Sequence, residues 1–249
     1  MMITYAIGDV HGRADLLHFL LKAIRKDAEE AGLPYKVVFL GDIIDRGSNS
    51  RMALELVIHT LAHVPGSKLI LGNHEEFMLR YIEDPRDRDT TREHWLANGG
   101  FETLASYGLR GDEPDSVIIV HLKQHRTHIE LLLKAENFVE DSMRFYVHAG
   151  VRPSVSLHDQ TPQDLRWIRR EFLDSTKDFG KIIVHGHTPT ASEQPEVYPN
   201  RIAVDTKAFA SGRLTAASFL GIPAPASFLC TEIANGEISI RRTSGERFT

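Results

Sequence analysis

Five short apolar runs, each followed by glycine and a polar side chain, constrain the fold of this chain more than any other feature. The runs are rich in Val, Ile, Leu and Phe, and each has the length of a β-strand that is buried on both faces. With their endings they read ITYAI-GDVHG, KVVFL-GDIIDRG, KLIL-GNHE, RFYV-HAG and KIIV-HGH. We therefore expect several buried strands whose ends share one kind of chemistry.

Helical patterns alternate with the first of these runs. Between the first two, leucines recur at helical spacing from Leu16 to Ile24, and Gly32 marks the end of the predicted helix. A second helix is predicted over residues 50–64, between the second and third runs. Alternating strands and helices predict an α/β architecture with a largely parallel sheet in this half of the chain.

The rest of the chain has weaker patterns. Residues 83–95 are highly charged and predict a solvated loop or the lead-in to a helix, whereas residues 99–108 and 128–140 predict helical segments. Near the C-terminus, Asn235-Gly236 between two short runs predicts a β-hairpin and an antiparallel sheet. The sequence has no repeat and no evident linker, so we expect a single catalytic domain over residues 1–249.

Composition excludes several classes of protein. The 249 residues are 42% hydrophobic, which is enough for a substantial core, and the net charge of -5 argues against non-specific nucleic-acid binding. No apolar stretch is long enough to cross a bilayer and no export signal is evident, so we expect a soluble, cytoplasmic protein with no membrane partner and no obligate protein partner. The single cysteine, Cys230, is expected in the core.

The polar strand ends indicate a metal site. The carboxyl ends of parallel strands meet at one edge of a sheet, and neighbouring glycines allow close approach to a ligand. Mixed oxygen and imidazole ligands suit Mn, Fe or Zn, and there are more candidates than one ion could use. Two ions that share a carboxylate would suit phosphoryl transfer. The competing interpretation is that each residue only forms a turn, but turns have no need of histidine.

The motifs GDVHG, GDIIDRG, GNHE, VHAG and HGHTP, in this order, resemble those of the phosphoprotein phosphatase family of calcineurin-like metallophosphoesterases, especially its bacterial and phage lambda-type members. The segments WLANGGFETLASYG, DLRWIRREFL and DTKAFASGRLTA extend the resemblance over most of the chain. It implies a calcineurin-like metallophosphoesterase fold, with two central β-sheets between helices in four α/β/β/α layers. It also implies a serine/threonine protein phosphatase whose partners are phosphorylated protein substrates.

The resemblance further implies a role for each motif residue. The implied ligands of two divalent metal ions are Asp9, His11, Asp42, Asn73, His148 and His187. Asp42 would bridge the ions, which would be Mn²⁺, with Fe or Zn as alternatives. Pro189 stands where the wider superfamily has another histidine, so the first metal would have fewer protein ligands.

The catalytic residues implied by the resemblance surround this centre. A metal-bridging hydroxide would attack phosphorus in line, and His74, oriented by Asp45, would protonate the leaving oxygen. Arg46 and Arg169, together with Asn73, would bind the substrate phosphate, because a guanidinium binds two phosphate oxygens at once.

The sequence leaves several alternatives open. The activity could instead be symmetric hydrolysis of diadenosine tetraphosphate, although GNHE rather than GNHD favours the protein phosphatase, or the chain could be an inactive phosphoprotein-binding scaffold. Arg170 competes with Arg169 for the phosphate role. The roles of His185 and of Lys207, which replaces a common glycine, are undecided. A further cluster, His121, His125 and His128, has the spacing of one helical face, and we expect it to be a solvated or loosely packed helix rather than a metal site.

Overall fold

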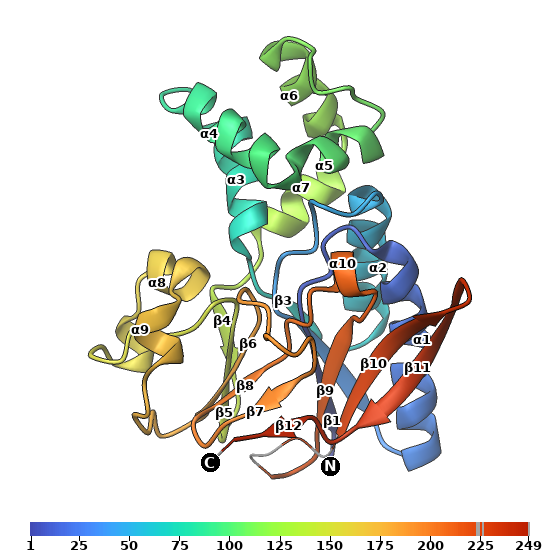
Figure 1. The fold of residues 1–249 in the computed structure, drawn as a ribbon. Helices are drawn as coiled ribbons and strands as arrows, with labels where there is room; N and C mark the ends of the chain where they lie inside the picture. The colour runs from blue at the N-terminus through green and yellow to red at the C-terminus, as the bar shows by residue number, and fades with distance from the viewer. Residues whose placement is uncertain (223–224, 226, 249) are drawn as a thin grey trace.

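Two six-stranded β-sheets pack against each other at the centre of the molecule (Figure 1). The structure is a computed structural model that describes residues 1–222, 225 and 227–248. The first sheet, in the order β11-β10-β9-β1-β2-β3, comprises β1 (Ile3–Ile7), β2 (Tyr35–Phe39), β3 (Lys68–Leu69), β9 (Thr215–Phe219), β10 (Ser227–Ala234) and β11 (Glu237–Thr243). The second, in the order β12-β7-β8-β6-β5-β4, comprises β4 (Phe138–Glu140), β5 (Arg144–Val147), β6 (Ile182–His185), β7 (Glu196–Val197), β8 (Arg201–Ala203) and β12 (Glu246–Arg247).

Both sheets are mixed. In the first, β1, β2 and β3 are parallel, whereas β9 joins β1 antiparallel and continues into the antiparallel pair β10 and β11. In the second, β5, β6 and β8 are parallel, β4 is antiparallel to β5, and β7 is antiparallel to β8 but parallel to β12. The parallel strands bring their carboxyl ends to one edge of each sheet. The expected parallel first half and antiparallel C-terminal part are confirmed.

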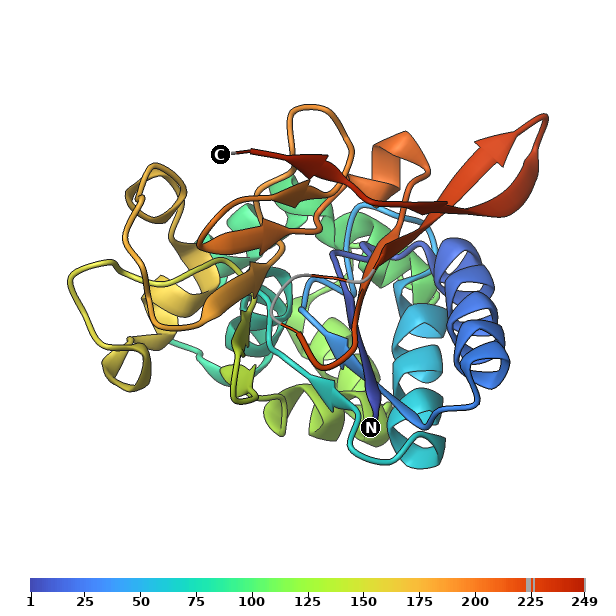
Figure 2. The same cartoon turned by 90° about the horizontal axis from the view of Figure 1, so that it is seen from below.

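Helices cover the outer faces of the two sheets (Figure 2). On the first sheet lie α1 (Ala14–Ala31) and α2 (Ser50–His63); on the side of the second sheet lie α8 (Pro162–Trp167) and α9 (Arg170–Leu173). The leucines of α1 are buried at helical spacing, and Gly32, with φ 63°, ends the helix in the left-handed conformation that glycine adopts readily. This arrangement gives four layers, α/β/β/α.

A helical cap projects beyond the sheets on the side where the parallel strands end (Figure 1). It comprises α3 (Asn73–Glu83), α4 (Arg88–Trp95), the kinked turn η1 (Leu96–Gly100), α5 (Phe101–Ser106), α6 (Asp115–Gln124) and α7 (Arg126–Leu133). Two short elements complete the chain: η2 (Leu157–Asp159) and α10 (Ala208–Ser211). The predicted loop or helix lead-in over residues 83–95 is only partly right, because residues 88–95 themselves form helix α4. The predicted helix over residues 128–140 is partly wrong, because residues 138–140 form strand β4.

Three further sequence predictions can be compared with the fold. The hairpin around Asn235 and Gly236 is confirmed, and both residues have the positive φ that a type I′ turn requires. Cys230 is buried between the sheets, as expected. The histidine cluster does not lie on one helical face, because α6 ends at Gln124 and α7 begins at Arg126. Within the described residues, no helix is long and apolar enough to cross a membrane.

Candidate active site

The polar strand ends converge at one place, at the edge of the sheets beneath the cap. The predicted metal ligands come from separate elements: Asp9 and His11 after β1, Asp42 after β2, Asn73 at the start of α3, His148 after β5, and His187 after β6. All six side chains are buried. Among the described residues, His11, Asp42 and His74 form one group with metal-ligand spacing, and Asp42, His148 and His187 form another. Asp42 is the member that both groups share.

The backbone at these positions is unusual. His11, Asp42 and His187 have φ between 46° and 66°, a left-handed conformation that costs a non-glycine residue free energy and persists where the surroundings enforce it. The neighbouring glycines make room for the carboxylates: a Cβ on Gly72 would collide with Oδ1 of Asp42, and one on Gly186 with Oδ1 of Asp9. The glycines in the motifs therefore allow the backbone to pack directly against the ligands.

One half of the site is built around Asn73. Its Oδ1 lies 2.9 Å from Nε2 of His148 and 2.8 Å from Nδ1 of His187. Nδ1 of His148 lies 2.8 Å from the carbonyl oxygen of Leu40 and can donate to it, which leaves Nε2 as the ligand atom. Nε2 of His148 is 3.4 Å from Oδ1 of Asp42. One amide oxygen, one carboxylate and two imidazoles thus face one another, a donor set that suits a transition-metal ion.

The other half contains Asp9 and His11. Nε2 of His11 lies 3.9 Å from Oδ2 of Asp9 and 3.7 Å from Oδ2 of Asp42, while its Nδ1 faces the carbonyl oxygen of Ile44 at 3.0 Å. Burial, together with the carboxylates of Asp205 and Asp42, raises the pKa of Asp9 well above its usual range. Buried carboxylates gathered this closely require cations, and divalent ions would offset their charge. The residues present therefore fit a metal centre.

Asp205 is a functional candidate that the sequence analysis missed. It follows β8 just as Asp9 follows β1, so the same strand-end pattern could have identified it. Its side chain is buried, and burial raises its pKa to about 6, with the charge of Asp42 as a further cause. Its Oδ1 accepts a hydrogen bond from the backbone N–H of Lys207 at 2.9 Å. Asp205 thus adds a carboxylate to the site and also anchors the backbone that follows it, at Lys207.

His74 and Asp45 form a buried pair beside the metal ligands. Nδ1 of His74 lies 2.7 Å from Oδ2 of Asp45, and Nε2 lies 3.8 Å from Oδ2 of Asp42. Burial would lower the pKa of His74, but the carboxylates of Asp42 and Asp45 outweigh it and raise the pKa. These carboxylates therefore favour the protonated form of the imidazole, whose Nε2 lies on the side of Asp42.

The cap fixes Asp45, a role that the sequence analysis did not assign, although both cap residues involved belong to the segment WLANGGFETLASYG. Its carboxylate accepts hydrogen bonds from Oγ1 of Thr103 at 2.6 Å and from Nε1 of Trp95 at 3.1 Å. Both donors are fully buried. Glu75, another residue given no role from the sequence, accepts backbone hydrogen bonds from Asp42 and from the two residues that follow it. The loop that carries Asp42 and Asp45 is thus held from two sides.

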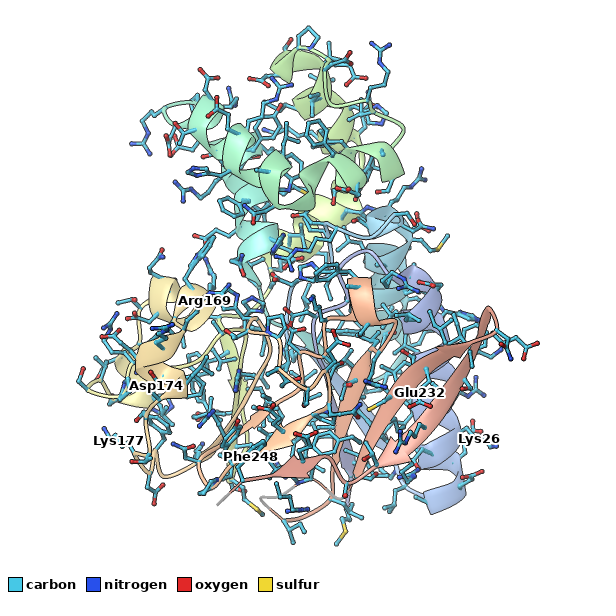
Figure 3. The ribbon with its side chains drawn as sticks, in the orientation of Figure 1. Lys26, Arg169, Asp174, Lys177, Glu232 and Phe248 are labelled. Atoms are coloured by element: carbon cyan, nitrogen blue, oxygen red, sulfur yellow. The ribbon has the colours of Figure 1, made fainter. Side chains whose placement is uncertain are left out.

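Two arginines border the site. Nη2 of Arg46 lies 3.2 Å from Nε2 of His74, and its guanidinium stacks over the ring of Phe209 at 4.8 Å. Arg169 lies between α8 and α9 and donates from Nη1 to Oγ1 of Thr188 at 3.4 Å, next to His187 (Figure 3). Arg169 rather than Arg170 makes this contact, so the structure favours Arg169 for the predicted phosphate role. Both guanidinium groups thus lie next to residues of the predicted site.

The undecided residues have structural explanations. His185 does not share the environment of His187: its ring packs edge-on against Phe172 at 5.0 Å, because the left-handed φ of His187 ends the strand alternation. Lys207 has φ 60°, which explains why glycine would suit this position. In the histidine cluster, His128 is buried with Nδ1 at 2.7 Å from the hydroxyl of Tyr107, and the three histidines form no metal-ligand group.

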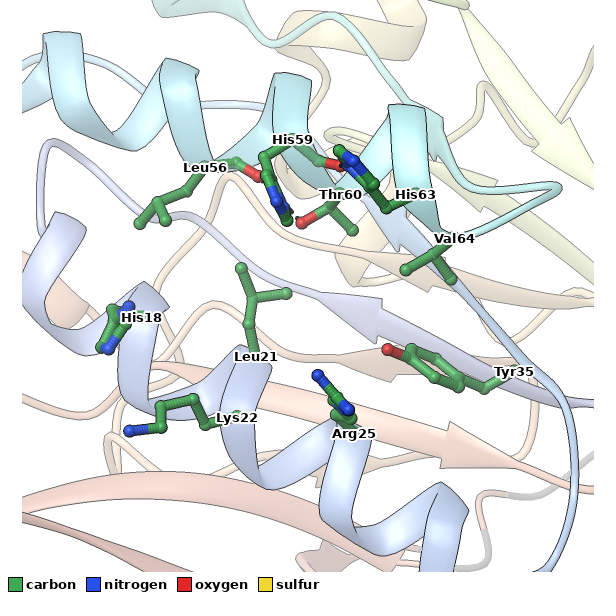
Figure 4. A pocket seen from close by; sticks show the side chains of 10 residues that line it. All are labelled: His18, Leu21, Lys22, Arg25, Tyr35, Leu56, His59, Thr60, His63 and Val64. Carbon is green, nitrogen blue, oxygen red and sulfur yellow. Dashed lines mark hydrogen bonds between the residues drawn. The ribbon is translucent and has the colours of Figure 1, made fainter.

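A separate cavity of about 520 Å³ lies between α1 and α2, away from these residues (Figure 4). Its walls include Leu21, Leu56 and Tyr35, and its rim includes Lys22 and Arg25. None of the predicted site residues lines it. We therefore place the chemistry at the strand ends and not in this cavity.

Comparison with known proteins agrees with the fold and the site. The chain belongs to the calcineurin-like phosphoesterase family, whose sequence model matches residues 2–210. The predicted fold class, two mixed sheets with flanking helices, is confirmed. With its buried His and Asp groups, the protein is a metal-dependent phosphoesterase in class, and the paired clusters are consistent with the dinuclear site typical of the family.

Individual relatives differ in what their names say they act on. The chain is similar to asymmetrical bis(5'-nucleosyl)-tetraphosphatase PrpE of Halalkalibacterium halodurans, with 26% identity over 86% of this chain and 88% of the relative, and of Bacillus thuringiensis, with 28% identity over 84% and 87%. It also shares its fold with a cold-active protein-tyrosine phosphatase of Shewanella, with a TM-score of 0.58, 18% identity, and 96% of this chain and 80% of that chain covered.

Proposed function

We propose that this protein is a phosphoprotein phosphatase that hydrolyses phosphoserine and phosphothreonine with two divalent metal ions, Mn²⁺ in the first instance and Fe or Zn as alternatives. The observation that carries the proposal is the buried His74-Asp45 pair next to Asp42, the residue that both metal-ligand groups share. The motif order supports assignment to the phosphoprotein phosphatase branch of the family. Bound metals would activate a water molecule and neutralise charge on the phosphate.

His74 suits this substrate class because serine and threonine are poor leaving groups. An alkoxide needs a proton as the ester bond breaks, and a positioned general acid typically contributes about 10²–10⁴-fold to the rate. Asp45 accepts from Nδ1–H of His74 and orients the ring, so that the protonated imidazolium would present its Nε2–H to the leaving oxygen. Arg46 and Arg169 border the same space and would hold the phosphate oxygens as they gain charge.

The leaving-group dependence of a His74→Asn variant tests this role. With a phosphoserine peptide, we expect kcat to fall by about 10²–10⁴-fold. With p-nitrophenyl phosphate, whose leaving group is a stable anion, we expect a loss of less than about tenfold, because protonation contributes little there. Metal content, measured by elemental analysis, should stay unchanged in the variant. Equal losses on both substrates would contradict the assignment of His74 as general acid, and a parent protein without turnover would favour an inactive scaffold.

A second candidate function is the hydrolysis of a dinucleoside tetraphosphate. The observation that favours it is the similarity to relatives named for asymmetrical cleavage, over most of both chains. Diadenosine tetraphosphate incubated with the protein and Mn²⁺ would give AMP and ATP by asymmetrical cleavage, or two ADP by symmetrical cleavage. Chromatography separates these products. A kcat/KM for this substrate well above that for phosphoserine peptides would make it the better assignment.

A further inference from the structure

A recess with both polar and apolar walls lies between the cap and α10, directly beside the candidate active site. It has a volume of about 510 Å³, and its apolar walls are Leu96, Ala97, Phe101 and Phe209. We call these four residues the apolar recess. Its lining also includes Arg46 and, from the cap, Asn98, Gly99 and Glu102. The recess is therefore formed by segments from three distant parts of the chain.

The recess and the catalytic centre are continuous. Arg46 belongs to both, since its guanidinium contacts Nε2 of His74 on one side and the ring of Phe209 on the other. Phe209 also packs edge-on against the ring of His11 at 5.4 Å. A substrate whose phosphate is bound next to His74 must therefore place its neighbouring atoms near this recess.

The irregular turn η1 builds one wall of the recess. The backbone N–H of Arg46 donates to the carbonyl oxygen of Gly99 at 3.1 Å. Gly99 has φ 103°, and a Cβ at this position would collide with the backbone of Arg46. Asn98 and Gly99 have non-helical φ and ψ, so η1 is a kink between α4 and α5. Here the turn brings the start of α5, and with it Phe101, alongside Arg46.

Phe101 is only partly covered by the cap. Its ring packs against Gly111, where an added Cβ would collide with it, yet its side chain is 49% exposed. Exposed apolar side chains that line a concave surface commonly mark binding sites. Phe101 also lines the recess that has Leu96 and Phe209 as walls. Its exposed part is therefore available to a ligand in the recess.

The charges around the recess indicate what it binds. Arg46 is committed to the phosphate and to Phe209, and the other charged residue of the lining, Glu102, is acidic. A carboxylate at this position repels a polyphosphate chain but not an uncharged side chain. We propose that the apolar recess binds a large apolar side chain of the substrate protein, close in sequence to the phosphorylated residue. This proposal rests on the proposed phosphoprotein phosphatase function and names its substrate class.

A paired series of phosphoserine peptides tests the recess. In each pair, one of the three positions on either side of phosphoserine is Leu in one peptide and Ala in the other. At one position at least, we expect kcat/KM to be about tenfold higher for the Leu peptide, as hydrophobic pockets discriminate by about this factor. In Phe101→Ala, the Leu/Ala ratio should fall to about twofold or less, and in the conservative Phe101→Leu it should largely persist.

A matched control is Phe19→Ala, which removes another exposed phenylalanine, 42% exposed on α1. It should keep the Leu/Ala ratio of the parent protein. A ratio near one at every position in the parent, or a ratio that Phe101→Ala leaves unchanged, would overturn the proposal. The same holds if Phe101→Ala instead reduces kcat/KM for diadenosine tetraphosphate only, since the recess would then bind a nucleoside.

The experiment separates failure of the recess from failure of the function. If the parent hydrolyses p-nitrophenyl phosphate but none of the phosphoserine peptides, the proposed function is wrong and the recess proposal falls with it. If the parent hydrolyses the peptides without any preference for Leu, the proposed function stands and only the recess proposal is overturned.

Discussion

At the scale of single residues, the site depends on backbone conformations that most side chains avoid. Several of its residues, among them His11, Asp42 and Arg46, have positive φ without being glycine. Such conformations cost free energy and are enforced by surrounding hydrogen bonds. One example is the hydrogen bond that Glu75 accepts from the backbone N–H of Ile43, in the loop after β2. The backbone conformations of the site therefore lower the free energy of unfolding of the protein.

Lys207 allows this cost to be measured outside the ligand set. The residue has φ 60° and ψ 46°. In Lys207→Gly, relief of about 1–2 kcal/mol of left-handed strain should exceed the greater chain entropy of glycine, about 0.4–1 kcal/mol. We expect the free energy of unfolding in urea to rise by about 0.5 kcal/mol. Lys207→Ala keeps the strain and serves as the control; an equal gain in that variant would contradict the explanation.

Thr103 is expected to act through Asp45. In Thr103→Val, the 2.6 Å hydrogen bond to Asp45 is lost while the side chain keeps its shape. The carboxylate of Asp45 then has one hydrogen-bond donor fewer, and losing a hydrogen bond to a charged group costs about 1.5–3 kcal/mol. We expect kcat for phosphoserine peptides to fall about tenfold, with a shift of the pH profile, because His74 is less well oriented. Thr103→Ser should retain most of the activity; unchanged kinetics in Thr103→Val would show that the cap does not position Asp45.

At the scale of elements, a buried histidine joins two parts of the cap, α7 and the residue that follows α5. His128 on α7 is buried against Tyr107, and burial lowers its pKa, with Arg51 and His125 as further causes and Glu55 opposing them. Because the unfolded chain binds a proton more readily, this contribution to stability is complete above pH 6.5 and is lost as the pH falls toward the folded pKa. The cap should therefore weaken first on acidification.

Replacing His128 tests the sign of this effect. We expect His128→Asn to destabilise the protein at pH 8, and the difference from the parent to shrink as the pH falls below 6.5. The change should approach about 1.4 kcal/mol for each unit by which the folded pKa is lowered. Urea unfolding at several pH values measures it. Leu132→Ala, at a buried position on the same helix, should give a difference independent of pH; a His128→Asn difference equally flat in pH would contradict the prediction.

The elements of the two sheets were predictable from the sequence to different degrees. The strands that enter the site were evident, because full burial makes them continuous apolar runs. Strand β4 was missed because three residues at the edge of a sheet are too few to show alternation. The break between α6 and α7 was missed because His125 fits the helical spacing although its backbone, with φ -81° and ψ 58°, is not helical.

The metal-ligand candidates were predictable because each occupies a motif at a strand end, and the structure brings all of them together. Thr103 and Trp95 do not follow a strand, and they reach Asp45 across 58 and 50 positions of chain, through the packing of the cap. Phe209 escaped notice for the same reason. Contacts between elements depend on how the helices pack, which motif spacing does not record. The catalytic and ligand roles themselves stay predictions.

At the scale of the whole molecule, the metal centre joins the two sheets. Asp9 and Asp42 follow strands of the first sheet, whereas His148 and His187 follow strands of the second. Bound ions would therefore stabilise the contact between the sheets as well as the local loops. Anything that binds only the folded state raises its stability in proportion to the logarithm of its concentration.

Metal removal should consequently lower the melting temperature. We compare the protein with added Mn²⁺ and the EDTA-treated protein. Once free Mn²⁺ exceeds its Kd a hundredfold, we expect the free energy of unfolding to be about 2.7 kcal/mol higher with Mn²⁺. Differential scanning fluorimetry over a range of Mn²⁺ concentrations measures the shift. Asp42→Asn removes the shared ligand and should abolish most of it, whereas Asp112→Asn, at an exposed surface carboxylate, should not. A shift that persists in Asp42→Asn would place the metal elsewhere.

The position of β1 in its sheet has a consequence for synthesis of the chain. β1 pairs with β2, which follows it closely, but also with β9, so that Thr4 lies opposite Phe219. During synthesis on the ribosome, one edge of β1 stays unpaired until β9 has emerged. Pairing between segments so distant in sequence is slow, and unpaired strand edges are prone to associate with other chains. We expect the nascent protein to depend on chaperones until β9 closes that edge.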